Sequence, residues 1–191
     1  MNRFNDLKIE NMSEEQSVVY NEIVSGPRGN VIGPLQVWLN NPKLASLAQL
    51  LGKYARYDSN LKNKLSELAI ITTGRCWSSE FEWEHHVPLA IKFGIDIKYI
   101  KKIELGMRPI FKNKKEQTVF DFSAEVNLKK KVSDKLYKEA INLLGKNAVI
   151  DIVAICGYYT LVSMTLNVFE IKSDKKLWPL PEVNNFTKML K

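Results

Sequence analysis

The chain contains little cysteine and little histidine, with two of each in 191 residues. Cys76 and Cys156 lie far apart in the sequence, and neither belongs to a CxxC pair. So few cysteines exclude the disulfide-rich framework on which small secreted domains depend. We therefore expect a protein with reduced thiols that works in the cytoplasm.

An apolar leader and alternating strand patterns are also missing. The first residues contain no apolar stretch, so the sequence predicts no signal peptide. The best strand-like stretch, residues 31–39, is interrupted by Pro34. One long apolar run, residues 148–169, approaches the roughly 20 residues that span a bilayer. Asp151 and Asn167 lie inside it, and a charge at mid-bilayer is costly, so we expect a buried core helix and no membrane partner.

The charge balance is basic, with 28 Lys and Arg residues against 21 Asp and Glu residues and a formal net charge of +7. Acidic residues are mixed among the lysines, and no motif combines basic side chains with aromatic stacking residues. This distribution indicates solvated helix faces, and we expect no nucleic-acid partner. The positive field still favours small anionic ligands.

Helix start and stop signals recur along the whole chain and predict an all-α protein with eight or nine helices in a single domain, residues 1–191. A glycine- and proline-rich loop is expected at residues 26–34. Asp58 or Ser59 is expected to cap a helix that ends at Thr73, where Gly74 breaks it. Residues 171–191 are expected to form a C-terminal arm docked on the fold. The helices are predicted at about 13–24, 41–54, 61–73, 79–94, 96–106, 114–131, 133–144 and 147–169.

One group of residues carries chemistry. At about 100° per residue, Ser79, Glu82 and His86 fall on one face of a helix. Glu82 and His86 form an i, i+4 pair, and a carboxylate beside an imidazole makes a general acid or base near neutral pH. Glu67 lies in an otherwise apolar stretch and needs a partner when buried, for which His86 is a candidate. His85 points about 100° away and is expected outside this site.

Plainer interpretations of the same residues stay open. Ser79 and Glu82 also fit a capping box, in which Glu82 serves only the helix end. No metal is expected, because the adjacent histidines diverge and the sequence has no HExxH motif. Cys156 is interpreted as a core thiol, and Cys76 as another candidate for one.

The spacing from Glu67 to Ser79, Glu82 and His86 resembles the carboxymuconolactone decarboxylase family, which includes the alkylhydroperoxidase D (AhpD) proteins. In the peroxidase branch of that family, the two cysteines of a CxxC motif stand where this chain has Ser79 and Glu82. The stretch EFEWEHHVPLAIKFGI, and the segment GPRGNVIGPLQVWLNNPKLASLAQLLGKYAR before it, resemble the decarboxylase-like branch. The resemblance covers roughly residues 13–170.

The resemblance implies an AhpD-like helical fold built around a helical hairpin, assembled as a homo-oligomer of three or six subunits. It implies decarboxylation without a cofactor, or related lyase or isomerase chemistry, on a small carboxylated lactone or a similar organic acid. The expected catalytic residues are Glu67, Glu82 and His86. His86 would donate the proton, and Glu82 would orient the His86 ring. Ser79, Trp83 and Arg28 are the expected substrate-binding residues, and Arg28 would hold a substrate carboxylate. Apolar walls are expected from the tryptophans Trp38, Trp77 and Trp83.

Two other functions remain open. An AhpD-like peroxidase or disulfide reductase would use Cys76, although the dithiol relay of the peroxidase branch requires the CxxC motif that this chain lacks. A non-enzymatic helical module would bind an acidic partner through its lysines. Loss of activity in Cys76→Ser would favour the first of these, and salt-sensitive binding that is indifferent to His86→Gln would favour the second.

Overall fold

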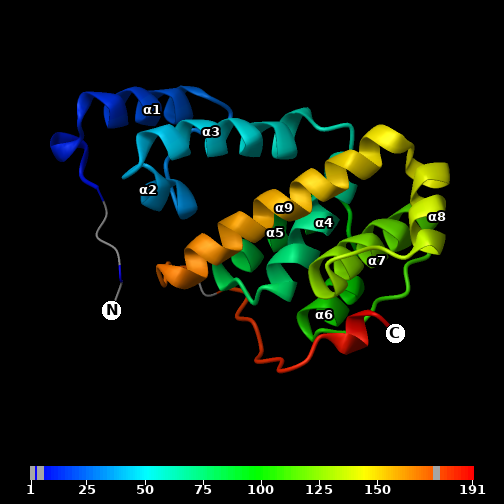
Figure 1. Ribbon diagram of the computed structural model, residues 1–191. Helices are drawn as coiled ribbons and strands as arrows, with labels where there is room; N and C mark the ends of the chain where they lie inside the picture. Colours follow the sequence, from blue (N-terminus) through cyan, green and yellow to red (C-terminus); the bar gives the residue numbers. More distant parts are fainter. Residues whose placement is uncertain (1–2, 4–6, 174–176) are drawn as a thin grey trace.

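The computed structural model describes residue 3, residues 7–173 and residues 177–191, and helices are the only regular secondary structure in this part of the chain. It contains nine α-helices and no strand, which confirms the predicted all-α class (Figure 1). The helices are α1 (Glu14–Ser25), α2 (Pro34–Trp38), α3 (Pro42–Lys53), α4 (Asn63–Cys76), α5 (Glu80–Lys92), α6 (Ile97–Glu104), α7 (Lys114–Lys129), α8 (Asp134–Leu144) and α9 (Lys146–Val168).

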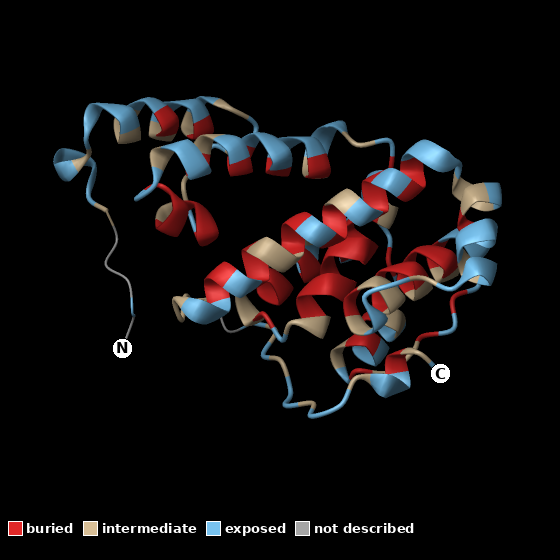
Figure 2. Cartoon of the chain, in the orientation of Figure 1, coloured by how far each residue is buried: buried red, intermediate tan, exposed pale blue. Residues whose placement is uncertain are grey.

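Helix α4 forms the centre of the molecule. It packs against α5, α7 and α9, and each residue from Ser66 to Arg75 is buried. Figure 2 shows the buried residues gathered on α4 and on the helix faces around it. A helix covered on every side has no solvent-facing stripe, which explains why the sequence LAIITT carries no amphipathic period.

Helix α9 is the long apolar run that the sequence predicts as a core helix. It is the one helix in the described part of the chain that is long and apolar enough to cross a membrane, and 61% of its most apolar window is buried inside the protein. Asp151 accepts hydrogen bonds from the Tyr54 hydroxyl at 2.6 Å and from the Asn60 backbone N–H at 2.7 Å. The charged residue in the run therefore has hydrogen-bond partners on a neighbouring segment.

Two predicted helix boundaries around α4 are wrong. The helix begins at Asn63 because residues before it are held outside the helical path, where Asn60 is bound to Asp151. Gly74 does not break α4, which continues to Cys76. A Cβ atom at position 74 would lie 3.3 Å from the Cβ of Glu82, so the absence of a side chain there allows α5 to approach α4 closely.

The N-terminal helices reach the rest of the molecule through α2 and through a π-helical turn, Tyr54–Asp58, that continues α3. Both segments contact α9, while α1 and α3 pack against each other at one side (Figure 1). Helix α2 was not predicted, because Pro34 reads as a strand breaker. Pro34 instead occupies the first position of α2, where the N–H group that proline lacks would have no partner within the helix. The indole of Trp38 then donates to Thr165 on α9 at 3.0 Å.

The chain after α9 lies against the helical body. The buried Glu84 carboxylate on α5 accepts hydrogen bonds from the Ser173 hydroxyl and from the backbone N–H of Trp178. The fully buried Arg75 donates to the Pro181 carbonyl oxygen at 2.8 Å and lies over the ring of Phe186. Two buried charged side chains therefore hold this segment in place.

Candidate functional site

Three residues that the sequence singles out meet inside the protein. Nδ1 of His86 lies 2.7 Å from a carboxylate oxygen of Glu67, and Nε2 lies 3.3 Å from a carboxylate oxygen of Glu82. Glu67 comes from α4 and the other two residues from successive turns of α5, the helix that approaches α4 at Gly74. All three are buried, so both ring nitrogens are held between carboxylates and shielded from bulk water.

The two carboxylates decide the charge of His86. Burial by itself would lower the pKa of the imidazole, but the attraction of Glu67 and the hydrogen bonds that Glu67 and Glu82 accept from the ring outweigh it, so the pKa of His86 is raised above 6.5. An imidazolium with both N–H groups donating satisfies both carboxylates at once. The edge-to-face contact of Tyr159, with ring centroids 5.1 Å apart, fixes the ring from a further side.

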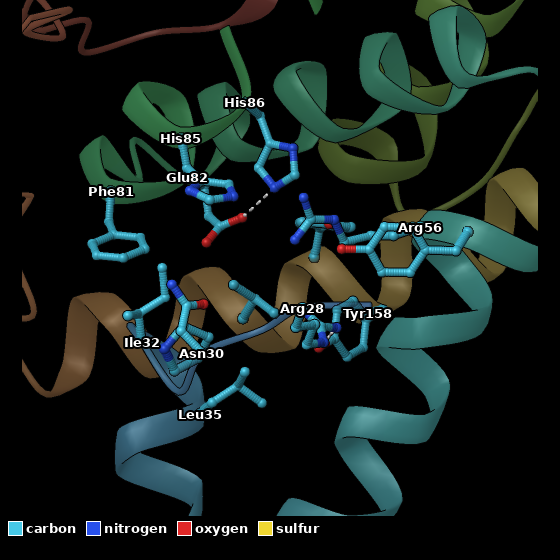
Figure 3. A pocket seen from close by; sticks show the side chains of 14 residues that line it. Arg28, Asn30, Ile32, Leu35, Arg56, Phe81, Glu82, His85, His86 and Tyr158 are labelled. Atoms are coloured by element: carbon cyan, nitrogen blue, oxygen red, sulfur yellow. Dashed lines mark hydrogen bonds and ion pairs between the residues drawn. The ribbon is translucent and has the colours of Figure 1, made fainter. Parts of the chain in front are cut away.

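A cavity of about 180 Å³ opens beside this triad. Glu82 and His86 form part of its wall, whereas Glu67 lies behind His86. The opposite walls come from the 26–34 loop, from α2, from the π-helical turn and from α9. Figure 3 shows Glu82 and His86 on one side of the cavity and Leu35, Arg28 and Tyr158 on the other. The cavity therefore lies between α5 on one side and the N-terminal segments and α9 on the other.

Two arginines line the cavity. Nη2 of Arg28 donates to the Tyr158 hydroxyl at 3.3 Å, and its Nε is buried without a partner. Arg56 comes from the π-helical turn and lies over the ring of Tyr57, with 5.2 Å between the guanidinium carbon and the ring centroid. Neither guanidinium forms an ion pair within the described part of the chain. The cavity thus combines a carboxylate–imidazole pair with two cations.

Two glycines allow the walls to come together. A Cβ atom at Gly33 would lie 2.7 Å from the ring of Phe81, and Gly33 also has a positive φ of 59°. On α3, a Cβ atom at Gly52 would collide with Arg28 and with the Tyr158 hydroxyl. The close approach of the loop and of α3 to the cavity therefore depends on these two positions lacking side chains.

Not every residue that the sequence singles out reaches the cavity. Ser79 is fully buried beside α4, and its hydroxyl has no partner in the described structure. It starts α5 without a side-chain capping bond, so the capping box that the sequence left open does not form. Trp83 is fully buried in the core, and the tryptophans expected as walls do not line the cavity. Phe81, Tyr158 and Tyr159 supply the aromatic walls instead.

The expectation for His85 is wrong. The sequence places it about 100° from His86 and outside the site, yet His85 lines the same cavity. Its ring stacks on Phe81 with an interplanar angle of 8°, and the cavity is wide enough to take in two neighbouring faces of α5. Among the described residues, no group of three or more His, Cys, Asp or Glu side chains has an arrangement that could hold a metal ion.

Sequence reasoning missed Arg56, Tyr158 and Tyr159. The sequence predicts that the helix ends at Tyr54, which leaves Arg56 in the connection after it, but residues 54–58 form a π-helical turn, a feature that often occurs at functional sites. A cluster of aromatic residues around one arginine was the available signal. Tyr158 and Tyr159 were hidden in an apolar run whose period does not distinguish core from cavity.

The cysteines lie apart from the cavity. Both are free thiols, and neither lines it. Burial raises the pKa of Cys76 to about 12, so its thiol stays protonated at neutral pH. Burial also raises the pKa of Cys156.

A scan against protein-family models finds no match for this chain, and a search of curated proteins finds none either. The resemblance to the carboxymuconolactone decarboxylase family therefore stays a prediction. Function is inferred from the geometry of the cavity and from the chemistry of the side chains that line it.

Proposed function

We propose that this protein is an enzyme that catalyses proton transfer on a small organic acid without a cofactor, as a decarboxylase or a related lyase or isomerase of the carboxymuconolactone decarboxylase type. One observation carries the proposal: a buried imidazole held between two carboxylates opens on a cavity that also contains unpaired cationic side chains. A titratable group with a perturbed pKa and a specific charged partner in a concave site is a candidate catalytic group.

The proposed reaction is the loss of CO₂ from a carboxylated lactone. The bond between the carboxyl carbon and the ring breaks, and its electron pair spreads into the lactone carbonyl as an enolate. The carbon then takes a proton from the His86–Glu82 pair, which is replenished from water. A positioned acid of this kind accelerates such a step by roughly 10²–10⁴-fold.

The geometry supports a division of labour that differs from the expectation. Glu82 was expected to orient His86, but Glu67 makes the shorter contact, 2.7 Å against 3.3 Å, and lies away from the cavity. We assign the orienting role to Glu67. Glu82 faces the cavity beside His86, so these two groups exchange the proton with the substrate.

Neither alternative function gains a specific observation. A peroxidase needs a nucleophilic thiolate with a resolving thiol, whereas burial holds the pKa of Cys76 at about 12. A binding module that acts through surface lysines has no need of a buried triad on a cavity.

The test is turnover of 4-carboxymuconolactone, followed by absorbance, with a panel of smaller carboxylated lactones beside it. We expect His86→Gln to lose at least 100-fold in kcat/KM while its melting temperature shows a folded protein. The matched control is Glu116→Gln, which changes another buried carboxylate, paired with Lys64 outside the cavity. Full activity is expected in that variant and in Cys76→Ser. Normal turnover by His86→Gln would refute the mechanism.

We also propose that the protein assembles with copies of itself. Helix α9 exposes apolar side chains at Ile150, Val153, Met164 and Val168, each at least 39% exposed. At 100° per residue these four positions fall within about 60° of one another, as a single stripe along α9. Their burial against a second copy would remove this apolar surface from water.

A further inference from the structure

We propose that Arg28 and Arg56 together bind one carboxylate group of the substrate, and that this contact sets which molecules enter the cavity. The inference rests on the proposed function for the location of the reacting carbon. It goes beyond the proposed function by assigning Arg56, a residue that the sequence analysis missed, and by defining the ligand as a carboxylate on an apolar body.

The first support is the state of Arg28. Its side chain is drawn into the cavity by a single weak hydrogen bond from Nη2 to Tyr158, and the buried Nε–H has no acceptor within the described structure. An orphaned donor on a charged group costs free energy unless a ligand satisfies it. Gly52 and Tyr158 hold the guanidinium close to α3 and α9, so the group is positioned before any ligand arrives.

The second support is the state of Arg56. It lines the same cavity and contacts the ring of Tyr57, and no carboxylate in the described chain pairs with it. Burial opposes its charge, but the field of Tyr159, Tyr57, Glu67 and Glu82 keeps the pKa of Arg56 above its ordinary value. The guanidinium therefore stays charged inside the cavity, within the electrostatic reach of the triad.

The remaining walls define the rest of the ligand. Phe81, Leu35, Tyr158 and Val162 surround the space with apolar and aromatic surface. Arg28, Arg56 and a protonated His86 supply three positive charges against the two of Glu67 and Glu82. One carboxylate at the arginines balances the surplus charge, and the second carboxylate of 4-carboxymuconolactone is the group that leaves as CO₂. Guanidinium forks also match carboxylate geometry. We therefore favour a carboxylate on a ring or hydrocarbon body.

The arrangement also orients the ligand. Arg28 lies across the cavity from Glu82 and His86 (Figure 3). A carboxylate fixed at the arginines directs the other end of a small acid toward the proton-transfer pair. Arg28 and Arg56, which we call the arginine clamp, thus hold the substrate, while the triad acts on a different carbon.

The experiment compares benzoate with benzamide, which has nearly the same shape but no charge. Each is titrated into the protein while amide chemical shifts are followed by NMR. We expect benzoate to bind at least tenfold more tightly than benzamide, with shifts at residues around the cavity. Arg28→Gln and Arg56→Gln should each weaken benzoate binding about tenfold or more, as expected for loss of a charged hydrogen bond. Arg56→Lys should fall between wild type and Arg56→Gln.

Arg3→Gln is the matched control, because Arg3 pairs with Glu170 on the surface and should leave binding unchanged. Equal binding of benzoate and benzamide, no binding of benzoate, or unchanged affinity in Arg56→Gln would each overturn the proposal. Tighter binding of inorganic phosphate than of benzoate would overturn the choice of carboxylate. Benzoate binding is measured at equilibrium and does not depend on turnover. If the arginine variants weaken benzoate binding as expected while His86→Gln turns over normally, the proposed function is refuted and the carboxylate site stands.

Discussion

His86 is a buried side chain whose surroundings favour its protonated, positively charged form. Its two nitrogens contact two carboxylates from different helices, and no backbone group of α5 takes part in these contacts. An unpaired buried imidazole would lose its proton, whereas this one gains affinity for it. The residue therefore joins two properties that are measured separately, the pH dependence of stability and the pH dependence of activity.

Stability is expected to fall as pH rises. The folded-state pKa of His86 lies above 6.5, so the stabilisation is fully present below pH 6.5 and is lost as pH rises through the folded pKa. Urea unfolding of wild type and His86→Gln at several pH values would measure this. The free-energy difference between the two proteins should shrink steadily above about pH 6.5; a constant difference would contradict the raised pKa.

The two carboxylates should differ in how strongly they hold that proton. Glu67→Gln is expected to lower the pKa of His86, because both the attraction of the carboxylate and its hydrogen bond with the protonated ring are lost. Glu82→Gln should lower it less, since its contact is 3.3 Å long rather than 2.7 Å. NMR titration of the ring resonances gives both values. A larger effect of Glu82→Gln would reverse the assigned roles.

Residue identities in this site were predictable where the helix period alone decided them. Glu82 and His86 stand four residues apart, so their contact follows from 3.6 residues per turn. Glu67 could be placed because a lone carboxylate in LAIITT surroundings needs a partner. Arg56 could not be placed, because a π-helical turn rotates the side chains after it away from the α-helical register.

At the scale of elements, α3 positions the arginine clamp through one missing side chain. Gly52→Ala is expected to displace Arg28 and the Tyr158 hydroxyl and to weaken benzoate binding several-fold while the fold is retained. Gly157→Ala on α9 is the matched control, because a Cβ atom there meets nothing within 4 Å. The control should bind as wild type and gain up to about 1 kcal/mol of stability. Unchanged binding in Gly52→Ala would show that the glycine does not position the clamp.

The segment after α9 should depend on the two buried charges that hold it. Glu84→Ala removes the acceptor for Ser173 and for the Trp178 backbone, at a cost of about 1–3 kcal/mol. Limited trypsin digestion followed by mass spectrometry should then detect earlier cleavage at the lysines of this segment, such as Lys188, than in wild type. Identical digestion kinetics would indicate that packing, rather than Glu84, holds the segment.

Helix ends were predictable where a side chain or a glycine marks them. Ser13 forms a capping box with Gln16, Asn41 and Asp96 cap α3 and α6, and Gly145 separates α8 from α9 with a φ of 86°. Gly74 failed as a stop signal, because close packing between helices uses glycine as readily as a helix end does. Such contacts between distant segments leave no local mark in a single sequence.

For the whole molecule, the stripe of exposed apolar side chains on α9 predicts a subunit contact. Analytical ultracentrifugation of wild type should give a mass above 22.0 kDa, consistent with three or six copies. Val153→Lys and Met164→Lys should shift the mass toward one copy while the helical content stays unchanged. Ile110→Lys alters an exposed apolar residue on another surface and should not change the assembly. A wild type of 22.0 kDa would refute the proposed assembly.

The cavity walls come from segments far apart in the chain, with Arg28 and Val162 at the extremes. During synthesis, the N-terminal helices emerge first and carry the clamp with nothing opposite to it. At roughly 5–20 residues per second, several seconds pass before α9 can close the remaining wall. Throughout that interval Leu35 and Trp38 face water, so the nascent chain displays the surface that chaperones recognise. Ribosome-bound chains halted before residue 146 lack α9 and the Tyr158 hydroxyl that contacts Arg28, so they should not bind benzoate.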